Sequence, residues 1–303
     1  MKDGMLEYSD WEAIRQRRSF LMVPVRRLEQ SGQSVLIEIA DNPIVATEKR
    51  TRRFLERENK AENGGKAWRW PAGGSVIFLK LKDCTVLLLI NRDLGAPSYK
   101  NHDTIPAGVG ADESEILYPK RVATREGWEE PVIVTPKGVI YPVFQNDDYG
   151  FTLEMKSIIW DSVRTLRSSL GSAIVPEKIV PANVRSVDLP DKKYLEIVWR
   201  GESVPCEATL NFDPETGGID VLVAFMVDLS RFRLDEITVL DGEVVGGNLI
   251  NRRIHAYEVV DLRPTGKIVA AWQAGKRQQI PEVEFPYQFV PHTAQIMEAL
   301  KRI

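Results

Sequence analysis

Cysteine and histidine are scarce in this chain, with two cysteines and three histidines among 303 residues. Cys84 and Cys206 both lie in apolar, strand-like runs, so we interpret them as buried thiols rather than as a disulfide framework. The histidines are scattered along the sequence, and a histidine-based metal cluster is therefore not expected. Metal-binding or catalytic side chains are therefore expected among the other residue types.

Long apolar runs and an excess of positive charge are also lacking. No apolar stretch approaches the roughly 20 residues of a membrane-spanning helix, and the N-terminus lacks the apolar core of a signal peptide. We therefore expect a soluble, cytoplasmic protein with no membrane partner. The net charge of −3 predicts no general attraction to nucleic acid. Thr47–Asn59 is rich in arginine, but its mixed charges favour a solvated helix over a nucleic-acid patch.

The stretch 106–131 gathers the acidic residues that are best placed for chemistry. Its second half predicts one helix, which begins at Pro119 and ends before the final proline. At about 100° per residue, Glu126, Glu129 and Glu130 share an arc of roughly 100° on that helix. Carboxylates crowded into a last helical turn repel one another and oppose the helix dipole. A divalent cation would offset that repulsion, since Mg²⁺ is held by carboxylates together with substrate phosphates.

The same stretch resembles the Nudix box, the loop–helix motif G-x5-E-x7-R-E-U-x-E-E-x-G-U of Nudix hydrolases, in which U is a large apolar residue. Residues 125–130, with the sequence Arg-Glu-Gly-Trp-Glu-Glu, match its R-E-U-x-E-E core. Residues 106–108, Pro-Ala-Gly, resemble the P-G-G that enters the box. Upstream, the apolar run 86–90 and the Arg-Asp pair at 92–93 resemble the strand and turn that precede this entry.

The resemblance implies a role for each residue of the motif. Glu126, Glu129 and Glu130 would bind the metal, which would be Mg²⁺ or Mn²⁺. Arg125 would orient these glutamates rather than touch the substrate. Gly108 would let the loop backbone approach the site closely, since a glycine has no side chain to keep it away.

The stretch departs from the motif at four points. By count, the first glutamate of the box would fall at Leu117, and the loop from Gly108 is three residues too long. Glu113 or Glu115 would fill that role if the extra residues bulge outward. Gly127 stands where a large apolar residue is usual, and no glycine follows the pair of glutamates.

The fold that the resemblance implies is α/β (α+β), a Nudix-type α/β/α sandwich with a mixed sheet. Residues 1–66 are predicted to be an N-terminal extension and 67–303 the Nudix domain, with an insertion at 145–199. Val221–Val227 is apolar on both faces, which is typical of a central strand. Met155–Leu170 is amphipathic and predicts a packing helix, with a homodimer contact as a further expectation.

The implied function is metal-dependent hydrolysis of a nucleoside diphosphate linked to another moiety, so the partner is a nucleotide-derived substrate. In Nudix folds a loop beyond the central strand often supplies another glutamate, for which Glu243 is the first candidate and Glu236 the second. Glu126 or Glu243 would take the proton of the attacking water.

Two other functions stay open. A Nudix-like module that binds a nucleotide or a partner protein without cleaving it would account for Leu117 and for the long loop. An isomerase of prenyl diphosphates resembles the same fold, but neither Cys84 nor Cys206 lies where its catalytic cysteine is expected.

Overall fold

The computed structural model describes residues 20–42, 44–46, 68–92, 99–144, 153–213, 217–245, 248–280 and 288–302. Within them the protein is a mixed α+β structure, in which most strands join one large mixed sheet and few helices accompany it. The coarse fold prediction is therefore confirmed. The basic stretch Thr47–Asn59 lies outside the described residues.

Two long strands lie side by side at the centre of the sheet. β4 (Arg69–Leu81) and β13 (Gly218–Leu229) run parallel, with Phe225 opposite Ile77. Nearly all of their residues are buried, which is expected where a sheet is covered on both faces. The prediction of a central strand at Val221–Val227 is confirmed.

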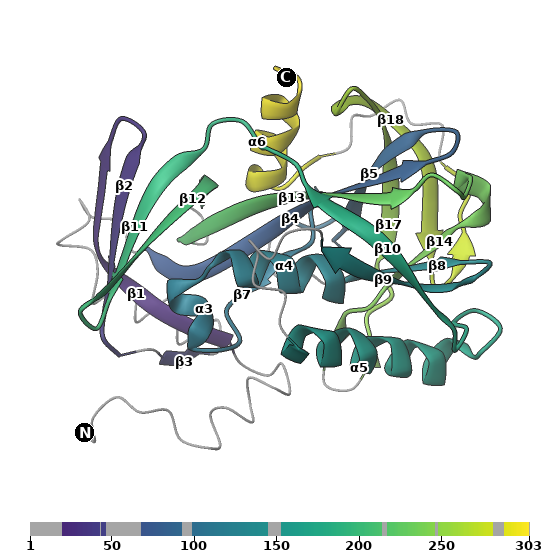
Figure 1. The fold of residues 1–303 in the computed structure, drawn as a ribbon, viewed down its shortest axis with the longest axis horizontal. Coiled ribbons are helices and arrows are strands. Elements are labelled where there is room, and N and C mark those ends of the chain that lie inside the picture. The colour runs from purple at the N-terminus through teal and green to yellow at the C-terminus, as the bar shows by residue number, and fades with distance from the viewer. Residues whose placement is uncertain are drawn as a thin grey trace.

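The broad part of the sheet extends from this pair in both directions (Figure 1). Its strand order is β14-β8-β9-β10-β13-β4-β5-β17-β18-β19. The flanking strands are β5 (Thr85–Asn91), β8 (Pro131–Thr135), β9 (Gly138–Phe144), β10 (Ile179–Ser186), β14 (Thr238–Asp241), β17 (Arg253–Val260), β18 (Arg263–Gln273) and β19 (Lys276–Arg277). Two short strands, β6 (Asp103–Thr104) and β7 (Ala107–Val109), pair with β5 and β4. A separate hairpin joins β15 (Val244–Val245) to β16 (Asn248–Leu249).

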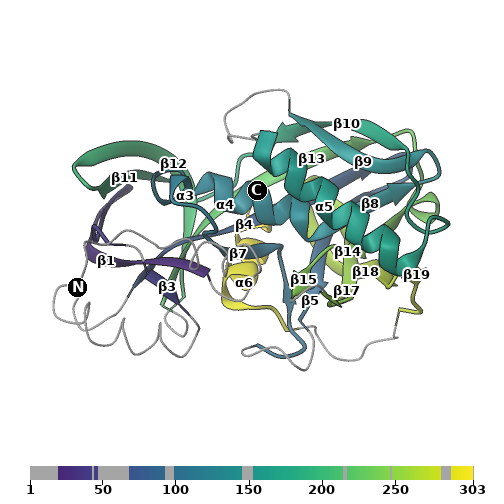
Figure 2. The same cartoon turned by 90° about the horizontal axis from the view of Figure 1, so that it is seen from below.

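Helices cover both faces of this broad part. α4 (Lys120–Glu129) and α5 (Leu153–Leu170) lie on one face, where Trp128 and Leu166 join a buried core with alternate residues of β4. α6 (Pro291–Leu300) lies on the other face, where its apolar residues pack on the remaining residues of β4. Figures 1 and 2 show these layers from two sides. None of the helices in the described part of the chain is long and apolar enough to span a membrane.

At one end of the molecule the strands close into a ring. β1 (Phe20–Ser31), β2 (Ser34–Ile39), β11 (Lys193–Trp199) and β12 (Glu202–Asp213) join β13 and β4 through an unbroken circuit of strand pairs. β3 (Ile44–Ala46) pairs with β1 outside the circuit. An apolar core fills the ring. Strand β2 of the predicted N-terminal extension thus pairs with strand β11 of the predicted insertion, while the division into these parts stays a prediction.

Helix α4 packs closely on β4 at two glycines. A Cβ on Gly73 would lie 2.7 Å from the backbone nitrogen of Ala123, and one on Gly127 would lie 2.6 Å from the Cβ of Ser75. The Ser75 hydroxyl donates to the Ala123 carbonyl at 2.5 Å. The large apolar residue that the motif usually places at 127 would have no room here, so glycine is explained by close packing of helix on strand.

Candidate metal centre

The last turns of α4 carry three buried glutamates. Pro119 caps the start of the helix, and β8 begins at Pro131, so the helix ends where the sequence predicts. Glu126, Glu129 and Glu130 are 8%, 4% and 4% exposed. Carboxylates are rarely buried to this degree unless a partner compensates their charge. Positively charged groups are therefore expected next to the three glutamates.

Arg125 supplies the first compensating charge. Its Nη1 donates to Glu126 Oε1 at 2.6 Å and to Glu129 Oε2 at 3.0 Å, and its Nε donates to Glu115 Oε1 at 2.9 Å. Its Nη2 donates to the Val109 carbonyl at 2.8 Å. Burial alone would lower the pKa of Arg125, but Glu126 and Glu115 outweigh that effect and the pKa lies above its ordinary value. Arg125 thus contacts all three of these carboxylates, while its role in orienting them for a metal stays a prediction.

The long loop before α4 is folded into a short helix, α3 (Ser114–Leu117). Glu115 is buried and accepts hydrogen bonds from Arg125 and, at 2.7 Å, from the backbone N–H of Ala111. Glu113 instead lies 3.8 Å from Arg200 on the ring, and Leu117 packs into the apolar core of the ring. Of the two alternatives for the missing glutamate, Glu115 is therefore the one that reaches the cluster, through Arg125.

Strand β7 brings backbone close to two of the glutamates. A Cβ on Gly108 would lie 2.3 Å from Glu126 Oε1, so only glycine fits there without displacing that carboxylate. The neighbouring N–H of Ala107 donates to Glu130 Oε2 at 3.0 Å. The β7 backbone at Gly108 thus lies close to the Glu126 carboxylate, while a role for Gly108 in binding stays a prediction.

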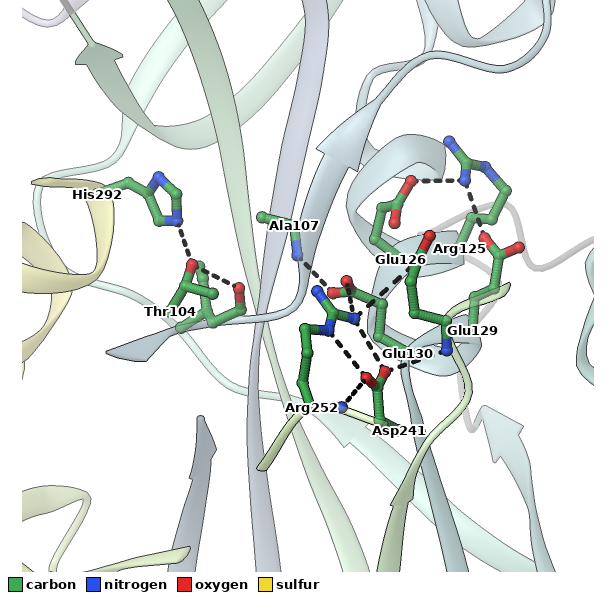
Figure 3. Close-up of polar contacts among 11 residues, drawn as sticks. Thr104, Ala107, Arg125, Glu126, Glu129, Glu130, Asp241, Arg252 and His292 are labelled. Atoms are coloured by element: carbon green, nitrogen blue, oxygen red, sulfur yellow. Dashed lines mark hydrogen bonds and ion pairs between the residues drawn. The ribbon is translucent and has the colours of Figure 1, made fainter. Parts of the chain in front are cut away.

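The loop after β14 closes the other side of the cluster (Figure 3). Asp241 accepts four hydrogen bonds: from the Glu243 N–H at 3.1 Å, and from the N–H, Nε and Nη2 of Arg252 at 2.7, 2.9 and 2.9 Å. Arg252 Nη2 also donates to Glu130 Oε1 at 2.8 Å and lies 3.8 Å from Glu243 Oε2. Asp241 therefore fixes both the Glu243 backbone and the Arg252 guanidinium beside α4.

These contacts bring three carboxylates close together beside the end of α4. Glu126, Glu130 and Glu243 each place an oxygen within 4.8 Å of the other two. Glu129 lies outside this group, with its Oε2 on Arg125, and its role as a metal ligand stays a prediction. Glu236 belongs to the 3₁₀ turn η1 (Leu234–Glu236), where its carboxylate accepts from the backbone N–H that precedes the turn.

The pKa of Glu130 lies well above its ordinary value, chiefly because the carboxyl group is buried. Burial raises its pKa most, Arg252 opposes the rise, and Glu243, Glu126 and Asp241 add to it, so that the pKa reaches about 8. The part of this rise that comes from Glu243, Glu126 and Asp241 reflects negative charge close to Glu130, beside the larger effect of burial. An additional cation would be stabilised at this position.

Sequence reasoning did not find Asp241 and Arg252. Asp241 lies two residues before Glu243, in the same polar loop at the end of a strand, and that placement could have drawn attention to it. Arg252 precedes β17 among ordinary polar residues, and no spacing marks it. Its contact with Glu130 joins residues 122 positions apart in the sequence.

Comparisons with known proteins add no relative to this description. No protein-family model, curated protein or solved structure matches the chain. The chemistry of the cluster is accordingly inferred from its own residues.

Proposed function

We propose that this protein is a Nudix-type pyrophosphohydrolase that uses Mg²⁺ or Mn²⁺ to hydrolyse a nucleoside diphosphate linked to another moiety. The observation that carries the proposal is the convergence of Glu126 and Glu130, from the helix that resembles the Nudix box, with Glu243 from a distant loop. The sheet between α4 and α6 supports the Nudix α/β/α sandwich as the corresponding fold.

The donor set fits a hard divalent cation. All three side chains offer carboxylate oxygens, which are the ligands that Mg²⁺ and Mn²⁺ favour. Two of the three carboxylates are buried, and Glu243, Glu126 and Asp241 add to the rise that burial causes in the pKa of Glu130, so a cation beside these carboxylates would be stabilised. When bound, the ion would lower the pKa of a coordinated water and neutralise charge on the pyrophosphate oxygens.

The residues of the chain take complementary roles in this proposal. Glu126 or Glu243 accepts the proton of the attacking water at a carboxylate oxygen. Arg125 and Asp241 hold these two residues in place through the contacts described above. Gly108 keeps the β7 backbone beside Glu126, where any side chain would displace the carboxylate.

A second candidate function is a module that binds a nucleotide derivative or a partner protein without cleaving it. One observation favours it: arginines already lie against each carboxylate of the cluster. Arg125 contacts Glu126 at 2.6 Å, and Arg252 contacts Glu130 at 2.8 Å and Glu243 at 3.8 Å. Such a cluster is partly neutralised without any metal.

A panel of nucleoside diphosphate derivatives, incubated with Mg²⁺ or Mn²⁺ and resolved by chromatography, separates the two functions. For the hydrolase we expect at least one derivative to be split at its pyrophosphate into two monophosphates. EDTA should abolish this reaction. Saturable binding by calorimetry, with no product after long incubation with either metal, would establish the binding module instead.

The pH dependence of metal binding provides a prediction that needs no substrate. A carboxyl group whose pKa is raised from 4.5 to about 8 on folding stabilises the metal-free protein at low pH. This contribution is complete below the unfolded pKa and is lost as the pH rises through the folded one. Because Mg²⁺ competes with the proton on Glu130, the rise in Tm caused by Mg²⁺ should be small at pH 6 and several degrees at pH 8.5. Glu130→Gln should remove this difference, whereas an equal shift of the wild type at both pH values would contradict it.

A further inference from the structure

The two arginines at the cluster use their donors differently. Each side-chain nitrogen of Arg125 donates to a carboxylate or to a carbonyl. Arg252 donates through Nε and Nη2, and among the described residues its Nη1 has no hydrogen bond. Nη1 carries two N–H groups, so Arg252 can donate to an anionic ligand in addition to its present carboxylate partners.

Exposure places Arg252 on the accessible side of the cluster. The side chains of Arg252 and Glu243 are 14% and 17% exposed, whereas those of Glu130 and Asp241 are 5% and 0% exposed. The buried carboxylate of Asp241 therefore holds the guanidinium through Nε and Nη2. The dashed contacts of Arg252 in Figure 3 use Nε and Nη2, which leaves Nη1 for a further ligand.

A metal ion bound at the cluster would make Arg252 more available to an anionic ligand. In the metal-free protein Arg252 Nη2 donates to Glu130 Oε1 at 2.8 Å. A divalent cation on the same carboxylate would repel the guanidinium, while the buried carboxylate of Asp241 keeps it in the site. A guanidinium in that position has donors available in the planar, forked arrangement that matches two phosphate oxygens.

We propose that Arg252 binds the pyrophosphate of the substrate, with Asp241 as its positioning residue. This inference rests on the proposed function, because it names the residue that recognises the group to be hydrolysed. It assigns the two arginines different tasks: Arg125 organises the metal ligands, and Arg252 contacts the substrate.

The test measures two ligands on the same variants by calorimetry. Mg²⁺ is titrated first, and methylenediphosphonate, a pyrophosphate analogue with a non-hydrolysable bridge, is then titrated at saturating Mg²⁺. In Arg252→Gln we expect the analogue to bind at least about tenfold more weakly, because a charge-assisted contact is lost. Mg²⁺ should bind with equal or higher affinity, because a competing cation is removed. Arg252→Lys keeps the charge and should weaken analogue binding less than Arg252→Gln does.

Arg253→Gln is the matched control, because Arg253 is the next residue and has no described contact with the cluster carboxylates. It should leave both affinities unchanged. Unchanged binding of the analogue in Arg252→Gln, or a loss of both ligands together, would overturn the assignment while leaving the metal site intact in the wild type. Failure of the wild type to bind Mg²⁺ would instead overturn the proposed function and this inference with it.

Discussion

Replacing Arg125 with methionine should lower the free energy of unfolding by about 3–5 kcal/mol, the usual cost of removing one partner from a buried ionic network. The substitution keeps much of the side-chain volume but leaves Glu115, Glu126 and Glu129 buried without their shared guanidinium. Urea denaturation of the metal-free protein measures the loss. In thermal unfolding the same change corresponds to a decrease in Tm on the order of 10 °C.

Arg121→Met is the matched control on the same helix. The Arg121 guanidinium lies over the ring of Tyr118 at 4.5 Å and is only partly buried, so its loss should change stability by less than about 1 kcal/mol. Equal effects of the two substitutions would show that Arg125 is no more than a surface charge. Saturating Mg²⁺ should restore part of the stability of Arg125→Met, because the bound metal ion then compensates the charge of Glu126 in place of the guanidinium.

Replacing Glu126 with glutamine should reduce turnover of the best substrate in the panel by about 10²–10⁴-fold. Glu126 belongs to the cluster with Glu130 and Glu243, occupies the space that a side chain at position 108 would need, and accepts a hydrogen bond from Arg125. Loss of its charge removes a metal ligand or the base, while affinity for the nucleotide should change little if the group acts mainly in the transition state. Steady-state kinetics and calorimetry on the same preparation measure both quantities.

Glu236→Gln is the control for this change. Glu236 is the second candidate from sequence. Its side chain closes the turn η1 and lies outside the cluster of Glu126, Glu130 and Glu243. Its substitution should leave turnover at the wild-type level. Wild-type turnover in Glu126→Gln would remove this residue from the chemistry, and equal losses in both variants would point to unfolding rather than to catalysis.

The parts of the site that could be predicted from sequence are those encoded locally. The start and end of α4 follow from two prolines, and the shared arc of Glu126, Glu129 and Glu130 follows from helical periodicity. The close approach at Gly108 follows from the absence of a side chain. Each of these features depends on residues that lie near one another in the chain.

Features that depend on long-range pairing could not be predicted. The choice between Glu113 and Glu115 is decided by α3, whose register is set when Ile116 and Leu117 enter the core of the ring. That ring exists only because β2 pairs with β11, far along the sequence. Arg252 likewise reaches Glu130 only after β17 has paired with β5.

A calorimetric titration of Mg²⁺ at pH 8.5 tests the central claim, that Glu126, Glu130 and Glu243 form a metal centre. We expect saturable binding to the wild type and to Glu236→Gln. Glu130→Gln and Glu243→Gln should each weaken this binding at least about tenfold, because each removes a charged ligand from the ion. No saturable binding to the wild type, or equal affinity in all four proteins, would contradict the account.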